Sequence, residues 1–158
     1  MYNTTGFTRS DVVELGDCKA EALQDEVGNV YPVQKTAEGA VAFLNNLPAK
    51  GSKTFAVASA QASAAPFEIA ADGHKIDTPF YTVTFDEHGQ MTGIFDKENR
   101  REVLKPGQTG NLFRVYEDKP IYYDNWDIDI FYTEKFWDVT DLQDFTWTEN
   151  GPVRATLH

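Results

Sequence analysis

The thirteen residues from Glu117 to Asp129 contain the side chains best suited to chemistry in this sequence. Carboxylates and three aromatic residues are crowded into this stretch without the spacing of a helix. Aromatic rings pack on the C–H faces of sugars, and carboxylate and amide groups exchange hydrogen bonds with vicinal hydroxyls. The pattern therefore favours a carbohydrate site. The alternative that composition leaves open is a loop of solvated aspartates whose tryptophan lies under a sheet.

Paired carboxylates can also be the acid and the nucleophile of a glycosidase. That chemistry needs two carboxyl groups that face one another, about 5 to 9.5 Å apart. Asp124, Asp127 and Asp129 are close in the sequence, which is not the usual way to place two groups on opposite sides of a bond. We therefore expect no complete active site in this stretch.

Other kinds of reaction centre lack support in the sequence. His74, His88 and His158 have no partner at helical spacing, and the only cysteine, Cys18, is far from all of them. A zinc site built by this chain alone is therefore not expected. The sequence has no Gly-x-Ser-x-Gly turn and no phosphate-binding glycine loop, so acyl transfer and nucleotide chemistry are unsupported.

The charge balance and the apolar runs exclude further classes of partner. The 158 residues include 25 Asp+Glu against 14 Lys+Arg, a net charge of −11. This excess repels phosphate backbones, and no basic cluster longer than Arg100-Arg101 offsets it, so no nucleic-acid partner is expected. The apolar runs are far shorter than the ~20 residues of a membrane span, which predicts no membrane association. A single cysteine fits a reducing compartment, and we expect cytoplasmic localisation.

Short runs of alternating apolar residues predict strands along most of the chain, and therefore an all-β fold of the antiparallel β-sandwich type. The strongest signal is a hairpin of residues 80–85 and 91–95, joined by a turn at 86–89. Further strands are expected at 12–15, 30–33, 40–44, 54–58, 112–116, 145–147 and 153–157. The few short helices are expected at 18–27 and 139–145.

The expected organisation is a small leading β-subdomain over residues 1–60 and a main sandwich part over 78–158, linked by the Ala-, Ser- and Gly-rich segment 59–77. The last residues are still in strand alternation, with no turn after them. The sequence is therefore interpreted as a fragment of a longer protein. A sandwich separated from its neighbours exposes apolar surface and an unpaired strand edge, so we predict self-association of the isolated chain.

Several motifs resemble, in the same order along the chain, the C-terminal β-region of the family 38 α-mannosidases. The most specific lies within 111–129, where Asn125 takes the place of the alanine in the family's usual Asp-Ala-Trp-Asp. Residues 80–104 are similar to the family's hairpin and the Asp-Lys turn after it. Asn3, Phe7 and Arg9 resemble the family's Asn-x-x-x-Trp-x-Arg entry into the first sandwich strand, with Phe7 at the tryptophan position. Segments 32–34 and 151–155 fit as well.

The resemblance implies a piece of a large enzyme with an N-terminal α/β catalytic domain, then a helical bundle, then β-sandwich domains. The catalytic domain of such an enzyme holds the zinc ion, the aspartate nucleophile and the acid. No catalytic residue, metal ligand or cofactor is therefore expected in this fragment. The implied fold is part of a galactose-mutarotase-like supersandwich. Five residues are candidates for sugar contact or for docking to other domains: Tyr122, Tyr123, Asp124, Trp126 and Asp127.

Two functions follow as hypotheses. The first is the non-catalytic β-sandwich portion of a zinc-dependent, retaining α-mannosidase, which supports and partly walls the sugar site of the parent enzyme. Its partners would be the catalytic and helical domains of that enzyme, and α-mannoside glycans. The alternative is a stand-alone carbohydrate-binding or protein-docking module. Under the first hypothesis the isolated chain is inactive as a hydrolase.

Overall fold

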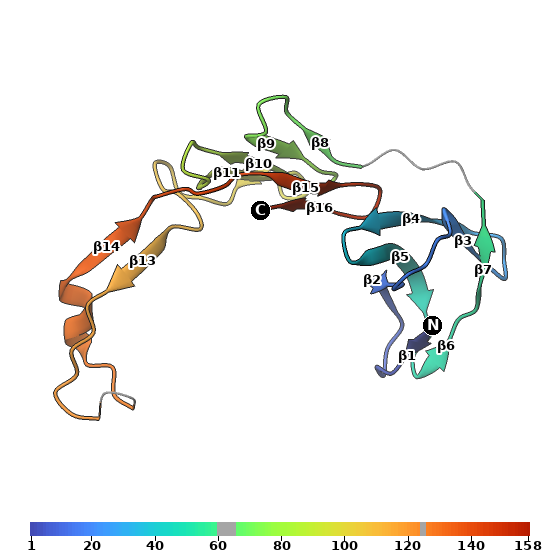
Figure 1. Ribbon diagram of the computed structural model, residues 1–158, viewed down its shortest axis with the longest axis horizontal. Helices are drawn as coiled ribbons and strands as arrows, with labels where there is room; N and C mark the ends of the chain where they lie inside the picture. The colour runs from blue at the N-terminus through green and yellow to red at the C-terminus, as the bar shows by residue number, and fades with distance from the viewer. Residues whose placement is uncertain (60–65, 124–125) are drawn as a thin grey trace. The chain divides into compact units, whose positions relative to one another are not determined.

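The computed structural model describes residues 1–59, 66–123 and 126–158, which contain strands and one short 3-10 helix (Figure 1). The paired strands of these residues run antiparallel. The predicted all-β, antiparallel fold class is therefore confirmed. The chain divides into two compact units, residues 1–68 together with 146–158, and residues 69–145.

The first unit contains a five-stranded sheet in the order β2-β5-β4-β3-β7. Its core includes the buried Leu44 and Ala42 of β5, and Val33, which lies opposite Ala42. Leu44 lies between the exposed Phe43 and Asn45, because successive side chains of a strand point to opposite faces. The strands are β2 (Arg9–Glu14), β3 (Ala22–Asp25), β4 (Val30–Thr36), β5 (Gly39–Leu47) and β7 (Phe55–Ala58), and a separate pair is formed by β1 (Tyr2–Asn3) and β6 (Gly51–Ser52).

The predicted helix at 18–27 is wrong, because this segment contains strand β3. β3 pairs with β4 on one side and with β7 on the other. Ala22 and Leu23, both good helix formers, are buried in this strand. Burial between two neighbouring strands outweighs the weak local preference for a helix.

The C-terminal hairpin also belongs to the first unit. It consists of β15 (Trp147–Asn150) and β16 (Ala155–Leu157), with Asn150 opposite Ala155. The strand expected at 145–147 therefore begins later, at Trp147, and the strand expected at 153–157 begins at Ala155. Asn150 therefore ends a strand, and residues 151–154 form the connection. His158 exchanges two backbone hydrogen bonds with Thr146, each 2.8 Å long, so the chain is paired up to its last residue.

The second unit contains the sheet β12-β11-β10-β9-β8. The predicted hairpin is confirmed as the pair β10 and β11. The carboxylate of Asp86 holds its turn by accepting hydrogen bonds of 2.9 Å from the backbone N–H groups of His88 and Gln90. Gly89 has φ +71° in this turn, a conformation that glycine adopts readily. The strands are β8 (Glu68–Ile69), β9 (Lys75–Asp77), β10 (Tyr81–Phe85), β11 (Met91–Asp96) and β12 (Arg101–Glu102).

A two-stranded hairpin in the same unit carries the candidate loop. It consists of β13 (Phe113–Tyr116) and β14 (Phe136–Val139), and the loop between them ends in the 3-10 helix η1 (Ile130–Glu134). The predicted helix at 139–145 is wrong, since Val139 ends β14 and no regular element follows before β15.

Aromatic packing fixes the segment after β14 to the sheet of the second unit. The ring of Phe145 stacks on that of His74, with 4.9 Å between their centres and 11° between their planes. The ring of Phe85 meets Phe145 edge-on at 5.6 Å. These contacts take the place of helical hydrogen bonds in ordering the segment.

The division into parts over 1–60 and 78–158 stays a prediction about domain organisation. The compact units of the structure differ from it at the C-terminal end, where residues 146–158 group with 1–68. The connecting segment contains strand β8. Residues 60–65 of that segment lie outside the described part.

Candidate functional site

The candidate loop presents its aromatic side chains to solvent. Tyr122, Tyr123 and Trp126 are 73%, 74% and 87% exposed. The carbonyl of Tyr123 accepts hydrogen bonds from the backbone N–H groups of Trp126, at 2.7 Å, and Asp127, at 3.0 Å. Tyr123 has φ +55°, in the left-handed region that residues other than glycine seldom adopt. The alternative that the tryptophan lies under a sheet is therefore wrong, and Asp124 lies outside the described residues.

Polar contacts close the base of this loop. The carboxylate of Asp129 accepts a hydrogen bond of 2.8 Å from the backbone N–H of Ile121. Glu117 is paired with Lys135 at 2.8 Å and with Lys119 at 2.9 Å, and the Lys135 ammonium lowers the pKa of this carboxyl most. Asp129 and Glu117 therefore hold the loop in shape. Of the predicted site residues, the structure brings Tyr123, Trp126 and Asp127 together through the backbone, and Tyr122 precedes Tyr123 in the sequence.

The carboxylates with shifted pKa values in the described residues act as hydrogen-bond acceptors. Burial raises the pKa of Asp25, but hydrogen bonds from Asn29, Lys53 and Tyr31 outweigh it and hold that pKa well below its usual range. The acid of a glycosidase instead needs a raised pKa. Hydrogen bonds from basic side chains or backbone N–H groups also lower the pKa values of Asp77, Asp96, Glu102, Glu117 and Glu149. None of these six described groups is tuned as such an acid.

The described ranges contain no group of three or more His, Cys, Asp or Glu side chains that could hold a metal ion. In the same part of the chain no helix is long and apolar enough to span a bilayer.

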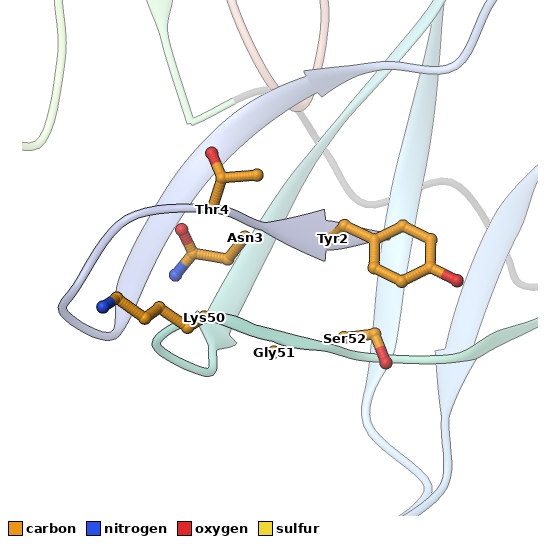
Figure 2. Close-up of a pocket in the computed structure, with 6 residues that line it drawn as sticks. All are labelled: Tyr2, Asn3, Thr4, Lys50, Gly51 and Ser52. Atoms are coloured by element: carbon orange, nitrogen blue, oxygen red, sulfur yellow. The ribbon is translucent and has the colours of Figure 1, made fainter.

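An open groove of about 450 Å³ lies along the pair β1 and β6, and sequence reasoning missed it (Figure 2). Tyr2 and Lys50 lie toward its two ends, and neither acid nor histidine lines it. Asn3 is buried at its base, where its amide donates hydrogen bonds to the carbonyls of Phe7 at 2.9 Å and Leu47 at 3.1 Å. The residues that line the groove therefore contain no pair of side chains suited to acid–base catalysis. Asn3 instead fixes the backbone at Phe7, which leads into β2.

A second feature that sequence reasoning missed joins β4 to the C-terminal hairpin. The side chain of Gln34 accepts hydrogen bonds of 2.9 Å from the backbone N–H groups of Val153 and Arg154, and donates one of 3.0 Å to the carbonyl of Arg154. Two segments noted for their family resemblance, 32–34 and 151–155, are therefore in contact. The sequence indicated both segments through the same family resemblance. That resemblance does not show that the two segments are close in space.

These observations define an all-β protein that carries an exposed aromatic and acidic loop on a two-stranded hairpin. Residues 76–158 match the glycosyl hydrolases family 38 C-terminal domain, and the chain belongs to this family. The family resemblance seen in the sequence is thereby confirmed.

Two curated relatives are α-mannosidases. Alpha-mannosidase G of Dictyostelium discoideum is 30% identical over 83 residues, which are 52% of this chain and 8% of that protein. Alpha-mannosidase 2C1 of Homo sapiens is 32% identical over 53 residues, which are 34% of this chain and 5% of that protein. The chain therefore spans only a small part of the length of these relatives.

Proposed function

We propose that this chain is the non-catalytic β-sandwich portion of an α-mannosidase of family 38, and that it supports and partly walls the sugar site of the parent enzyme. The names of the two relatives and the match over 76–158 support an α-mannoside as the substrate of that enzyme. The zinc ion and the catalytic carboxylates would come from residues outside this chain. Cytoplasmic localisation is part of the same proposal.

The exposed loop is the observation that carries the proposal. It lies inside the family-matched region, and the rings of Tyr122, Tyr123 and Trp126 are more than two-thirds exposed. Rings of this kind stack on the C–H faces of a sugar, and the carboxylate of Asp127 is available to accept hydrogen bonds from its hydroxyls. The loop can therefore bind and orient a mannoside without taking part in bond cleavage.

The test uses the parent enzyme with Trp126→Ala and, as a control, Tyr2→Ala, which removes a similarly exposed ring in the first unit. Loss of one stacking contact should raise KM for an aryl α-mannoside roughly 3- to 10-fold, and the control should leave it unchanged. An unchanged KM for Trp126→Ala would contradict the role of the loop. Turnover of the same substrate by the isolated 158-residue chain would contradict the non-catalytic assignment.

The alternative is a stand-alone carbohydrate-binding module, which the exposure of the same rings also favours. An NMR titration of the isolated chain with methyl α-mannoside separates the two hypotheses. Saturable shifts of the Trp126 indole signal at millimolar sugar favour the module. No shift favours a loop that binds sugar only beside the rest of the enzyme.

A further inference from the structure

The strands β13 and β14 have one face on which their side chains are all apolar. In the register of its strands Phe113 lies opposite Val139, and Val115 lies opposite Trp137. Opposite residues share a face of a sheet, so these four side chains form one surface, hereafter the apolar face. Phe113, Val139, Val115 and Trp137 are 72%, 47%, 54% and 50% exposed.

The opposite face of the same hairpin is satisfied by its own contacts. Arg114 and Asp138 form an ion pair of 2.6 Å, and the Arg114 guanidinium lies 4.0 Å from the centre of the Phe136 ring. The ring of Tyr116 packs on those of Phe136 and Tyr132, at 5.8 Å and 5.2 Å between centres. Charges and rings are paired here. On the apolar face the Lys135 ammonium lies 5.0 Å from the centre of the Trp137 ring, and all four apolar side chains are still about half exposed or more.

The hairpin also lacks a core. Every described residue from 111 to 144 is exposed or half-buried. A two-stranded hairpin is at best marginally stable in water without a further packing layer. Contiguous exposed apolar surface of this kind marks an interaction site. The complete protein therefore needs another layer over the apolar face.

We propose that the apolar face docks on an apolar surface bordered by Lys and Arg side chains, which the remaining polypeptide of the parent enzyme provides. This inference rests on the proposed function. Residues 111–144 contain nine carboxylates and three basic side chains, a net charge of −6. A basic border on the partner is attracted by this charge, whereas a second copy of the chain brings the same charge and is repelled.

The length of the relatives supports the remaining polypeptide of the parent enzyme as the partner of the apolar face. The matched residues make up 8% of alpha-mannosidase G, so most of the surface of an enzyme of that length lies outside this chain. The hairpin itself lies within the family-matched region. The occupant of the apolar face is accordingly assigned to the same polypeptide.

Hydroxyl-radical footprinting tests this on the native polypeptide, purified with an antibody against the 158-residue chain and weighed by mass spectrometry. The oxidation rate of Trp137 is compared between the native polypeptide and the isolated chain. Trp137 is 50% exposed, so burial to less than about a tenth should lower its rate about fivefold. Phe113 should follow, while Tyr116 on the opposite face keeps its rate.

Each outcome separates the docking proposal from the proposed function. Equal Trp137 rates in a native polypeptide much heavier than 17.8 kDa overturn the docking and leave the proposed function standing. Protection that disappears on dilution identifies a second copy as the occupant and also overturns the docking. A native mass of 17.8 kDa overturns the proposed function itself.

A matched pair of variants in the native polypeptide gives a second readout. Trp137→Lys places a charge in the docked surface and should lower the thermal midpoint. Tyr2→Lys changes another aromatic residue, which is 86% exposed in the first unit and outside the candidate loop, and should leave the midpoint unchanged. Equal midpoints for the two variants contradict the proposal.

Discussion

Replacing Gly151 by alanine is predicted to destabilise the first unit through the side chain of Gln34. A Cβ atom at residue 151 would lie 2.4 Å from Cδ and 2.6 Å from Oε1 of Gln34. That amide cannot move away freely, because it makes three hydrogen bonds to the backbone of Val153 and Arg154. The substitutions Gly151→Ala and Gln34→Ala therefore both disrupt the hydrogen bonds between Gln34 and residues 153–154.

The magnitude follows from those hydrogen bonds. Gln34→Ala leaves the N–H groups of Val153 and Arg154 without their acceptor, which costs about 2–4 kcal/mol of unfolding free energy. Gly151→Ala displaces the amide and should cost about 2–3 kcal/mol for the same reason. In the double variant the amide is absent, so the added alanine meets no obstacle. The double variant should be about as stable as Gln34→Ala alone, which gives a coupling energy of about 2 kcal/mol.

Thermal unfolding followed by circular dichroism measures these differences. A loss of about 2–3 kcal/mol lowers Tm by about 5–10 °C in a chain of this size. Gly6→Ala is the control, since nothing lies within 4 Å of a Cβ atom there. Additive losses in the double variant would refute the reasoning, because they would show that Gly151 and Gln34 act independently. The reasoning would also be refuted if the Gln34→Ala variant were as stable as the wild type.

Two further predictions concern pH and salt. Hydrogen bonds hold the pKa of the folded Asp25 carboxyl below its unfolded value, so its stabilisation is complete above about pH 4 and is lost as the pH falls further. Asp25→Asn should flatten the dependence of Tm on pH between pH 5 and pH 2, with Asp17→Asn as the exposed control, and an unchanged slope would contradict this. The isolated chain should self-associate when salt screens its net charge of −11. The Debye length of the solution falls from about 10 Å at 0.1 M salt to about 3 Å at 1 M, which weakens the repulsion between two copies. Light scattering that reports a monomer at both salt concentrations and at high protein concentration would contradict this.

Most strands could be predicted from the sequence because alternation records which face of a strand is buried. The hairpin of β10 and β11 is the clearest case, since its turn residues and its alternation agree. Strand β3 could not be predicted, because Ala22 and Leu23 favour a helix locally and become a strand only by pairing with β4 and β7. The pairing of Leu23 with Val57 of β7 joins segments that are distant in the sequence, and no local pattern contains it.

The candidate loop could be located from its composition, but its exposure could not. Aromatic residues between aspartates are compatible with a buried or an exposed tryptophan. The structure decides for exposure, since Trp126 is 87% exposed and no described residue between 111 and 144 is buried. The contact of Gln34 with Val153 and Arg154 was also beyond the sequence, since about 120 residues separate the partners.

The family resemblance and the proposed function rest on different kinds of residue. In the segments that resemble the family, Asn3 bonds the carbonyl of Phe7, Gln34 bonds the backbone of Arg154, and Asp96 bonds the turn at Asn99. Each of these polar side chains is buried and satisfied inside the chain, so its role is to hold the backbone. The rings of the candidate loop and of the apolar face are instead half exposed or more. This arrangement supports the proposal that the chain is a scaffold for recognition, whose exposed rings contact a sugar or another part of the enzyme.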